Sequence, residues 1–226
     1  MNSPSNAAFN SETLDAVRRI LTPRDFPQYS QLDPHWEFEP GTERRMCGIV
    51  CTKAVLDFYS PDGLSPSIHE IVAQVKQGND QKPNGISHAV EVNVLKSQGL
   101  VAWRRNWEAP SSDPSWLVEN ESYDTEQVDA IKQQLAAEGS SEDVLSASLM
   151  SIKESLANNN PVIASVRPYF GDNAADHQIV ITEISKDGQY IVVMDPIQQP
   201  GTEIRTETTE RFARYFNRKA IFSRQV

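Results

Sequence analysis

Cys47, His177 and Asp195 are the residues whose types could together perform covalent catalysis. A cysteine thiolate attacks acyl carbons, a histidine carries the proton, and an acid holds the imidazole in one tautomer and orientation. This chemistry requires that the three side chains meet in space. We therefore asked which elements of secondary structure the sequence predicts around each of them.

The residues after Cys47 predict a helix that begins close to the cysteine. Apolar residues recur at a spacing of three to four from Val50 to Tyr59, which is typical of a helix with one buried face. Free backbone N–H groups and the positive end of the helix dipole would favour the thiolate at that position. A single cysteine at a helix start is more often a packing residue, so Cys47 needs partners before it indicates catalysis.

The pairing of His177 with Asp195 is predicted by a hairpin. Two runs rich in β-branched residues, 177–184 and 190–194, flank the turn sequence Lys186-Asp187-Gly188. This turn places the start of the first strand beside the end of the second, so His177 and Asp195 should lie within a residue or two of each other. Separately, the histidine could simply open a strand and the aspartate could cap a turn. Together with Cys47 they favour a nucleophilic site.

The remaining pattern predicts an α+β fold, an N-terminal helical layer packed on a C-terminal antiparallel sheet. The predicted helices are 11–21, 47–59, 65–77, 87–97, 125–137, 141–158 and 208–215, and the predicted strands are 101–103, 161–166, 177–184, 190–194 and 220–223. We expect residues 1–25 to form an N-terminal arm with a short helix and residues 26–226 to form the catalytic domain.

Composition excludes several classes of protein. The chain has 226 residues and a formal net charge of −10, which argues against binding to nucleic acid or to anionic membranes. It contains no apolar run long enough to span a membrane and no secretory signal, so we expect a cytoplasmic protein, with signal-less export left open. Two cysteines four residues apart on one helix predict free thiols, since a bridge between Cys47 and Cys51 would be strained.

Other candidate sites are weaker. Cys47, Cys51, His69 and His88 lack the paired spacing of a structural zinc site, so no metal is expected. The loop containing Tyr169 and Phe170 runs directly into His177 and is therefore a candidate substrate subsite, together with Gly48 beside the nucleophile.

Several short motifs resemble the bacteriocin-processing double-glycine peptidases and their stand-alone relatives, which are papain-like cysteine peptidases. The wide separation of cysteine and histidine is also similar to papain-type chains. The resemblance covers roughly residues 26–226. It is carried by Cys47-Gly48 and the helix ending Val55-Leu56-Asp57-Phe58-Tyr59, by Gln31-Leu32-Asp33-Pro34-His35-Trp36, by Leu95-Lys96-Ser97-Gln98-Gly99-Leu100, by Asn160-Pro161-Val162-Ile163-Ala164-Ser165-Val166, by His177, and by Asp195-Pro196 with Gly201.

The resemblance implies a papain-like fold, with Cys47 as nucleophile, His177 as general acid/base and Asp195 as the orienting acid. It also implies an oxyanion hole formed by the Cys47 backbone N–H and a glutamine amide. The leader-processing enzymes carry that glutamine about six residues before the cysteine, where this chain has Gly41. Gln31 is our first candidate for the missing donor and Gln28 the second.

Two further departures lie beside the catalytic positions. Ile49 stands where proline is usual in these enzymes, and Asp176 stands where glycine often precedes the histidine. An acid beside His177 would favour the protonated imidazole.

The predicted function is a thiol hydrolase that cleaves peptide or amide bonds of a peptide or protein through a thioester, without a cofactor. No ATPase segment accompanies the domain, so we expect a stand-alone enzyme. Two alternatives remain open at this point. One is an acyltransferase or amidase that uses the same triad, and the other is a catalytically idle relative that binds a peptide or protein.

Overall fold

A computed structural model describes residues 26–38, 46–60, 62–78, 86–107, 141–167 and 177–226, and side chains of the fifth segment from residue 145 onward. The predicted N-terminal arm, the helix 125–137 and the loop residues Tyr169 and Phe170 lie outside these segments.

Six antiparallel strands form one sheet with the order β1-β6-β2-β3-β4-β5. The strands are β1 (Val101–Asn106), β2 (Val162–Val166), β3 (His177–Ile184), β4 (Tyr190–Met194), β5 (Ile204–Thr208) and β6 (Phe216–Arg224). The helical elements are η1 (Pro34–Trp36), α2 (Cys47–Tyr59), α3 (Ile68–Gly78), α4 (His88–Ser97), α7 (Ser141–Ala157) and α8 (Thr209–Tyr215).

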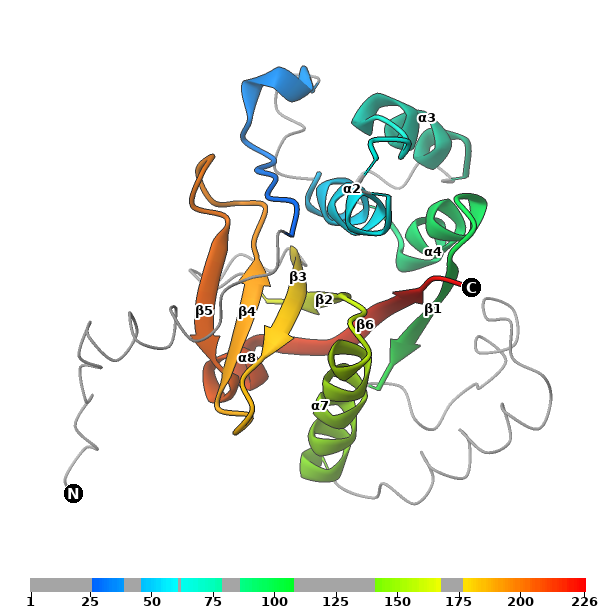
Figure 1. Ribbon diagram of the computed structural model, residues 1–226. Helices are drawn as coiled ribbons and strands as arrows, with labels where there is room; N and C mark the ends of the chain where they lie inside the picture. Colours follow the sequence, from blue (N-terminus) through cyan, green and yellow to red (C-terminus); the bar gives the residue numbers. More distant parts are fainter. Residues whose placement is uncertain (1–25, 39–45, 61, 79–85, 108–140, 168–176) are drawn as a thin grey trace.

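The sheet is covered on both faces. Helices α2, α3 and α4 lie on one side of it and α7 lies on the other (Figure 1). On β3, Val180 packs into the core under α2, whereas Ile179 and Ile181 pack into the core on the α7 side. A strand buried on both faces reads as a continuous apolar run, which explains the composition of β2, β3 and β4. The predicted α+β fold is confirmed.

The hairpin forms in the predicted register. Val180 pairs with Met194 and Ile181 with Val193, followed by an irregularity near Thr182. Gly188 at the turn has a φ of +73°, in the left-handed region that glycine adopts readily. Helix α4 begins at His88, one residue after the predicted start, and the Ser87 side chain caps it by accepting from the Val90 N–H.

The structure differs from the prediction in one strand that was not expected and in the bounds of three other elements. Strand β5 was not predicted, because Ile204–Thr208 alternates charged and polar residues and forms the outer strand of the sheet. Strands β1 and β6 are longer than expected, since polar residues such as Lys219 pair across them with Asn106. Helix α3 begins at Ile68 rather than near Ser65.

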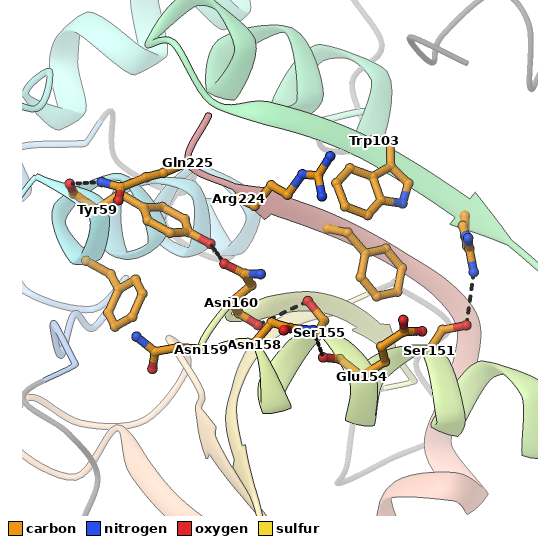
Figure 2. Close-up of a pocket in the computed structure, with 13 residues that line it drawn as sticks. Tyr59, Trp103, Ser151, Glu154, Ser155, Asn158, Asn159, Asn160, Arg224 and Gln225 are labelled. Carbon is orange, nitrogen blue, oxygen red and sulfur yellow. Dashed lines mark hydrogen bonds between the residues drawn. The ribbon is translucent and has the colours of Figure 1, made fainter. Parts of the chain in front are cut away.

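The C-terminal end of α2 is fixed to the sheet. The Tyr59 hydroxyl lies 2.8 Å from the Ser223 carbonyl oxygen. It also lies 3.1 Å from Asn160 Oδ1, and Gln225 Nε2 donates to the Tyr59 carbonyl at 3.0 Å (Figure 2). These contacts border a pocket of about 850 Å³. Cys47 is at the other end of α2, so these contacts fix the helix without involving its first turn.

Among the described helices, none combines the length and the apolar character needed to cross a lipid bilayer.

Candidate active site

Cys47 is the first residue of α2, as predicted, and its side chain is close enough to His177 to raise the pKa of the imidazole. The cysteine is 9% exposed, whereas Cys51, one turn further along the helix, is fully buried. Neither cysteine is in a disulfide. The helix start therefore presents one thiol to an imidazole and places the other in the core.

His177 and Asp195 meet at the open end of the β3–β4 hairpin. His177 begins β3, Asp195 follows the last residue of β4, and His177 Nε2 lies 2.7 Å from Asp195 Oδ1. With Nε2 engaged by the carboxylate, Nδ1 is the ring nitrogen left for the Cys47 thiol. The structure thus brings together the three side chains that the sequence singled out.

The electrostatics of this pair favour an imidazolium next to a carboxylate. Burial by itself would lower the pKa of His177, but hydrogen bonds to Asp195 and Cys47 raise it to about 9. Burial by itself would raise the pKa of Asp195, but its hydrogen bond to His177 and the nearby positive charges hold it below the ordinary value. At neutral pH the pair is therefore charged.

Arg205 on β5 completes the surroundings of the acid. Asp195 is 0% exposed, and its Oδ2 accepts from Arg205 Nη2 at 2.7 Å and from Gln198 Nε2 at 3.3 Å. The Ile197 N–H donates to Oδ1 at 3.2 Å. Arg205 was not predicted as a site residue, because strand β5 was not predicted. The signal that could have found it is the Ile-Arg-Thr-Glu-Thr alternation, which fits an edge strand.

Gln31 is held at the same corner through its backbone. Its N–H donates to the Pro196 carbonyl oxygen at 2.7 Å, and the Ser30 hydroxyl donates to the Gln198 carbonyl oxygen at 2.5 Å. The Gln31 side chain is 0% exposed, and neither polar atom of its amide has a hydrogen-bond partner among the described residues. Gln28, the second candidate, is exposed.

Gly48 lies against two polar side chains that the sequence analysis did not select. A Cβ at this position would lie 2.0 Å from Glu91 Oε1 and 2.2 Å from Gln178 Oε1, so only glycine fits. The expectation that Gly48 borders the substrate stays a prediction. So does the subsite of Tyr169 and Phe170, which lies outside the described residues.

No cluster in the described segments offers three or more His, Cys, Asp or Glu side chains to a metal ion. His88, one of the residues considered for zinc, instead places Nε2 2.7 Å from the Ser165 hydroxyl.

The pocket at the far end of α2 lacks a comparable arrangement (Figure 2). Its two serines are engaged elsewhere, since Ser151 accepts from Arg105 and Ser155 donates to the Asn160 carbonyl oxygen. The arrangement of cysteine, histidine and aspartate is at the start of α2.

Comparison with solved structures finds similar peptidase domains. The chain is similar to the peptidase domain of Streptococcus ComA, a bi-functional ABC transporter involved in a quorum sensing pathway, with a TM-score of 0.51 and 16% identity over 89% of this chain and 99% of that chain. It also matches a double glycine motif protease from an AMS/PCAT transporter, solved in complex with the leader peptide, with a TM-score of 0.44 and 14% identity over 80% of this chain and 84% of that one. No curated protein matches the chain.

The sequence itself matches the Peptidase_C39 like family over residues 23–220. This span includes α2, the hairpin and all three side chains that meet at the site. The chain therefore belongs to the Peptidase_C39 like family and is a cysteine peptidase-like hydrolase.

Proposed function

We propose that the protein hydrolyses peptide bonds with Cys47 as nucleophile, His177 as general acid/base and Asp195 as the orienting acid. The observation that carries the proposal is the chain of contacts from the Cys47 thiol through the His177 imidazole to Asp195. Peptide or protein substrates are proposed because the family is one of peptidases.

In this mechanism the Cys47 sulfur attacks the carbonyl carbon of the scissile bond. His177 then donates its proton to the leaving amine as the C–N bond breaks, which leaves a thioester and a neutral imidazole. A water molecule next gives a proton to His177 and attacks the thioester carbon. Collapse of that adduct releases the carboxyl product and regenerates the thiolate–imidazolium pair.

The oxyanion formed in both steps needs hydrogen-bond donors, and we assign these to the Cys47 backbone N–H and the Gln31 amide. The buried Gln31 amide, which has no partner among the described residues, supports this assignment. The backbone hydrogen bond from Gln31 to Pro196 supports it too, because it holds the glutamine next to the residue after Asp195.

Selective alkylation tests the nucleophile. At pH 6, we expect iodoacetamide to modify Cys47 at least about tenfold faster than a free cysteine thiol, because the imidazolium stabilises the thiolate. Cys51, buried in the same helix, serves as the internal control and should stay unmodified. Cys47→Ser should abolish both the modification and peptide hydrolysis. Mass spectrometry of the native protein gives the two rates, and a Cys47 as slow as Cys51 would contradict the proposal.

A product assay with a peptide substrate distinguishes hydrolysis from acyl transfer and from binding without reaction. With hydroxylamine added to a peptide substrate, a hydrolase gives mainly the carboxyl product and an acyltransferase gives mainly the hydroxamate. A chain that binds peptides without reacting would give neither product.

The raised pKa of His177 predicts a pH-dependent stability. The imidazolium is favoured in the folded state, so its stabilising effect is complete below the unfolded pKa of about 6.5 and is lost as pH rises through about 9. We expect the free energy of unfolding to fall by on the order of 2 kcal/mol over this interval, relative to the His177→Gln variant. Urea denaturation at pH 6.5 and pH 9.5 measures the difference. Parallel pH profiles of the two proteins would refute the assignment.

Gln31→Ala should lower kcat by about 10² to 10³ with little change in KM, because an oxyanion donor acts mainly in the transition state. Gln31→Glu should be at least as impaired, since a carboxylate repels the oxyanion. Steady-state kinetics on one peptide measures both variants. If Gln28→Ala lost the activity and Gln31→Ala kept it, the donor would be Gln28.

Arg205→Met should lower kcat/KM by roughly tenfold and the free energy of unfolding by about 3 kcal/mol, because it removes one of the two cations that pair with the buried Asp195 carboxylate. The matched control is Arg214→Met, which removes an exposed ion pair with Glu210 and should change both quantities little. Equal effects of the two substitutions would show that Arg205 does not support Asp195.

A further inference from the structure

Glu91 is a fully buried acid beside the nucleophile helix that the proposed mechanism does not use. Its side chain projects from α4 and is 1% exposed. Glu91 Oε2 accepts from Gln178 Nε2 at 2.8 Å, and this hydrogen bond is buried. The other oxygen, Oε1, is buried and has no hydrogen-bond partner among the described residues.

The position of that second oxygen indicates a proton on it. Glu91 Oε1 and Gln178 Oε1 both crowd the point where Gly48 would carry a Cβ, at 2.0 Å and 2.2 Å. Two acceptor oxygens held side by side repel unless one of them bears a hydrogen. A protonated Glu91 can donate from Oε1 to the amide oxygen of Gln178 while Oε2 accepts from the amide nitrogen, which satisfies both side chains.

Burial supports the same protonation state. Desolvation raises the pKa of Glu91 well above its ordinary value and outweighs the hydrogen bond from Gln178, which lowers it, while the nearby Cys47 raises it slightly further. The partner of Glu91 is an amide and not a cation, so it gives an ionised carboxylate one hydrogen bond but no opposite charge.

The contact joins the immediate neighbours of the two reacting residues. Gly48 follows Cys47 on α2, and Gln178 follows His177 on β3. A second hydrogen bond holds α4 nearby, because His88 Nε2 lies 2.7 Å from the hydroxyl of Ser165, which pairs directly with Gln178 in the sheet. Burial lowers the pKa of His88 to about 4, so this bond is also neutral at pH 7.

We propose that Glu91 is a positioning residue that acts as a neutral carboxylic acid. Paired with the Gln178 amide and packed on Gly48, it fixes the start of α2 against the start of β3 and so sets the approach of the Cys47 thiol to His177. It acts through these neighbours and does not touch substrate. The part of the inference that concerns the reaction rests on the function proposed above, whereas the neutral acid–amide pair does not.

The charge state matters for the nucleophile. An ionised Glu91 would place a second negative charge close to the Cys47 thiolate in a region of low dielectric, which disfavours the thiolate. A neutral acid supplies two hydrogen bonds of fixed geometry without that penalty.

Substitutions at Glu91 test the pairing. Glu91→Gln replaces the acid by an amide of the same shape that can donate to Gln178 Oε1 and accept from Nε2, so kcat and the rate of Cys47 alkylation should stay within about threefold of wild type. Glu91→Leu removes both hydrogen bonds, and kcat should fall by at least tenfold with KM little changed. The double variant Glu91→Gln with Gln178→Glu again pairs one acid with one amide, at exchanged positions. Its kcat should therefore be much closer to that of the wild type than to that of Glu91→Leu.

Infrared difference spectra test the proton independently of turnover. The wild type minus Glu91→Gln spectrum at pH 7 should contain the C=O stretch of a protonated carboxyl group. The exposed Glu70 gives the contrast, since wild type minus Glu70→Gln should show only carboxylate bands.

The measurements test the neutral pairing, the positioning role and the catalytic proposal separately. A carboxylate signature for Glu91, or a Glu91→Gln variant as inactive as Glu91→Leu, would overturn the neutral pairing. A folded Glu91→Leu variant with wild-type kcat would overturn the positioning role, and circular dichroism establishes that it is folded. If Cys47 of the wild type were unreactive while the protonated carboxyl band persisted, the catalytic proposal would fail and the acid–amide pair would stand.

Discussion

The buried hydrogen bond between His177 Nε2 and Asp195 Oδ1 is the interaction on which the geometry of this site depends. It closes the open end of the β3–β4 hairpin and turns the imidazole toward the start of α2. Burying a charged pair costs free energy unless further hydrogen bonds satisfy the carboxylate. Here Arg205 and the Ile197 N–H supply them, so strand β5 and the turn after β4 help to hold Asp195 beside His177.

The same turn also places the candidate oxyanion donor. Backbone groups of Pro196 and Gln198 accept from Gln31 and Ser30, so a segment from the start of the domain is fixed beside an acid close to its end. Tyr29, in the same segment, donates to Asp57 of α2. The nucleophile helix and the hairpin are thus joined by the segment 29–31 as well as by the Cys47–His177 contact.

Local signals made the central part of this arrangement predictable from sequence. The periodicity after Cys47 and the Asp187-Gly188 turn are short-range patterns, and together they place His177 beside Asp195 and a thiol at a helix start. Arg205, Gln178 and Glu91 gave no such signal, because their burial arises from elements distant in sequence. Glu91 in particular resembles any charged residue of a surface helix until α4 is packed beside α2, where its side chain meets Gln178 of β3. Gln31 was suggested by family resemblance, whereas its backbone bond to Pro196 follows only from the tertiary structure.

The polar groups around Cys47 divide into a charged set and, on our proposal, a neutral set. On the hairpin side, the Asp195 carboxylate pairs with His177 and Arg205. Its charge therefore stabilises the imidazolium, and the two cations offset its repulsion of the thiolate. On the α4 side, Glu91 pairs with an amide and His88 with a hydroxyl. A thiolate gains from a nearby cation and loses from a nearby anion. Of the two described acids near Cys47, Asp195 can therefore remain ionised at little cost because cations pair with it, whereas Glu91 contributes best as a neutral hydrogen-bonding group of fixed shape.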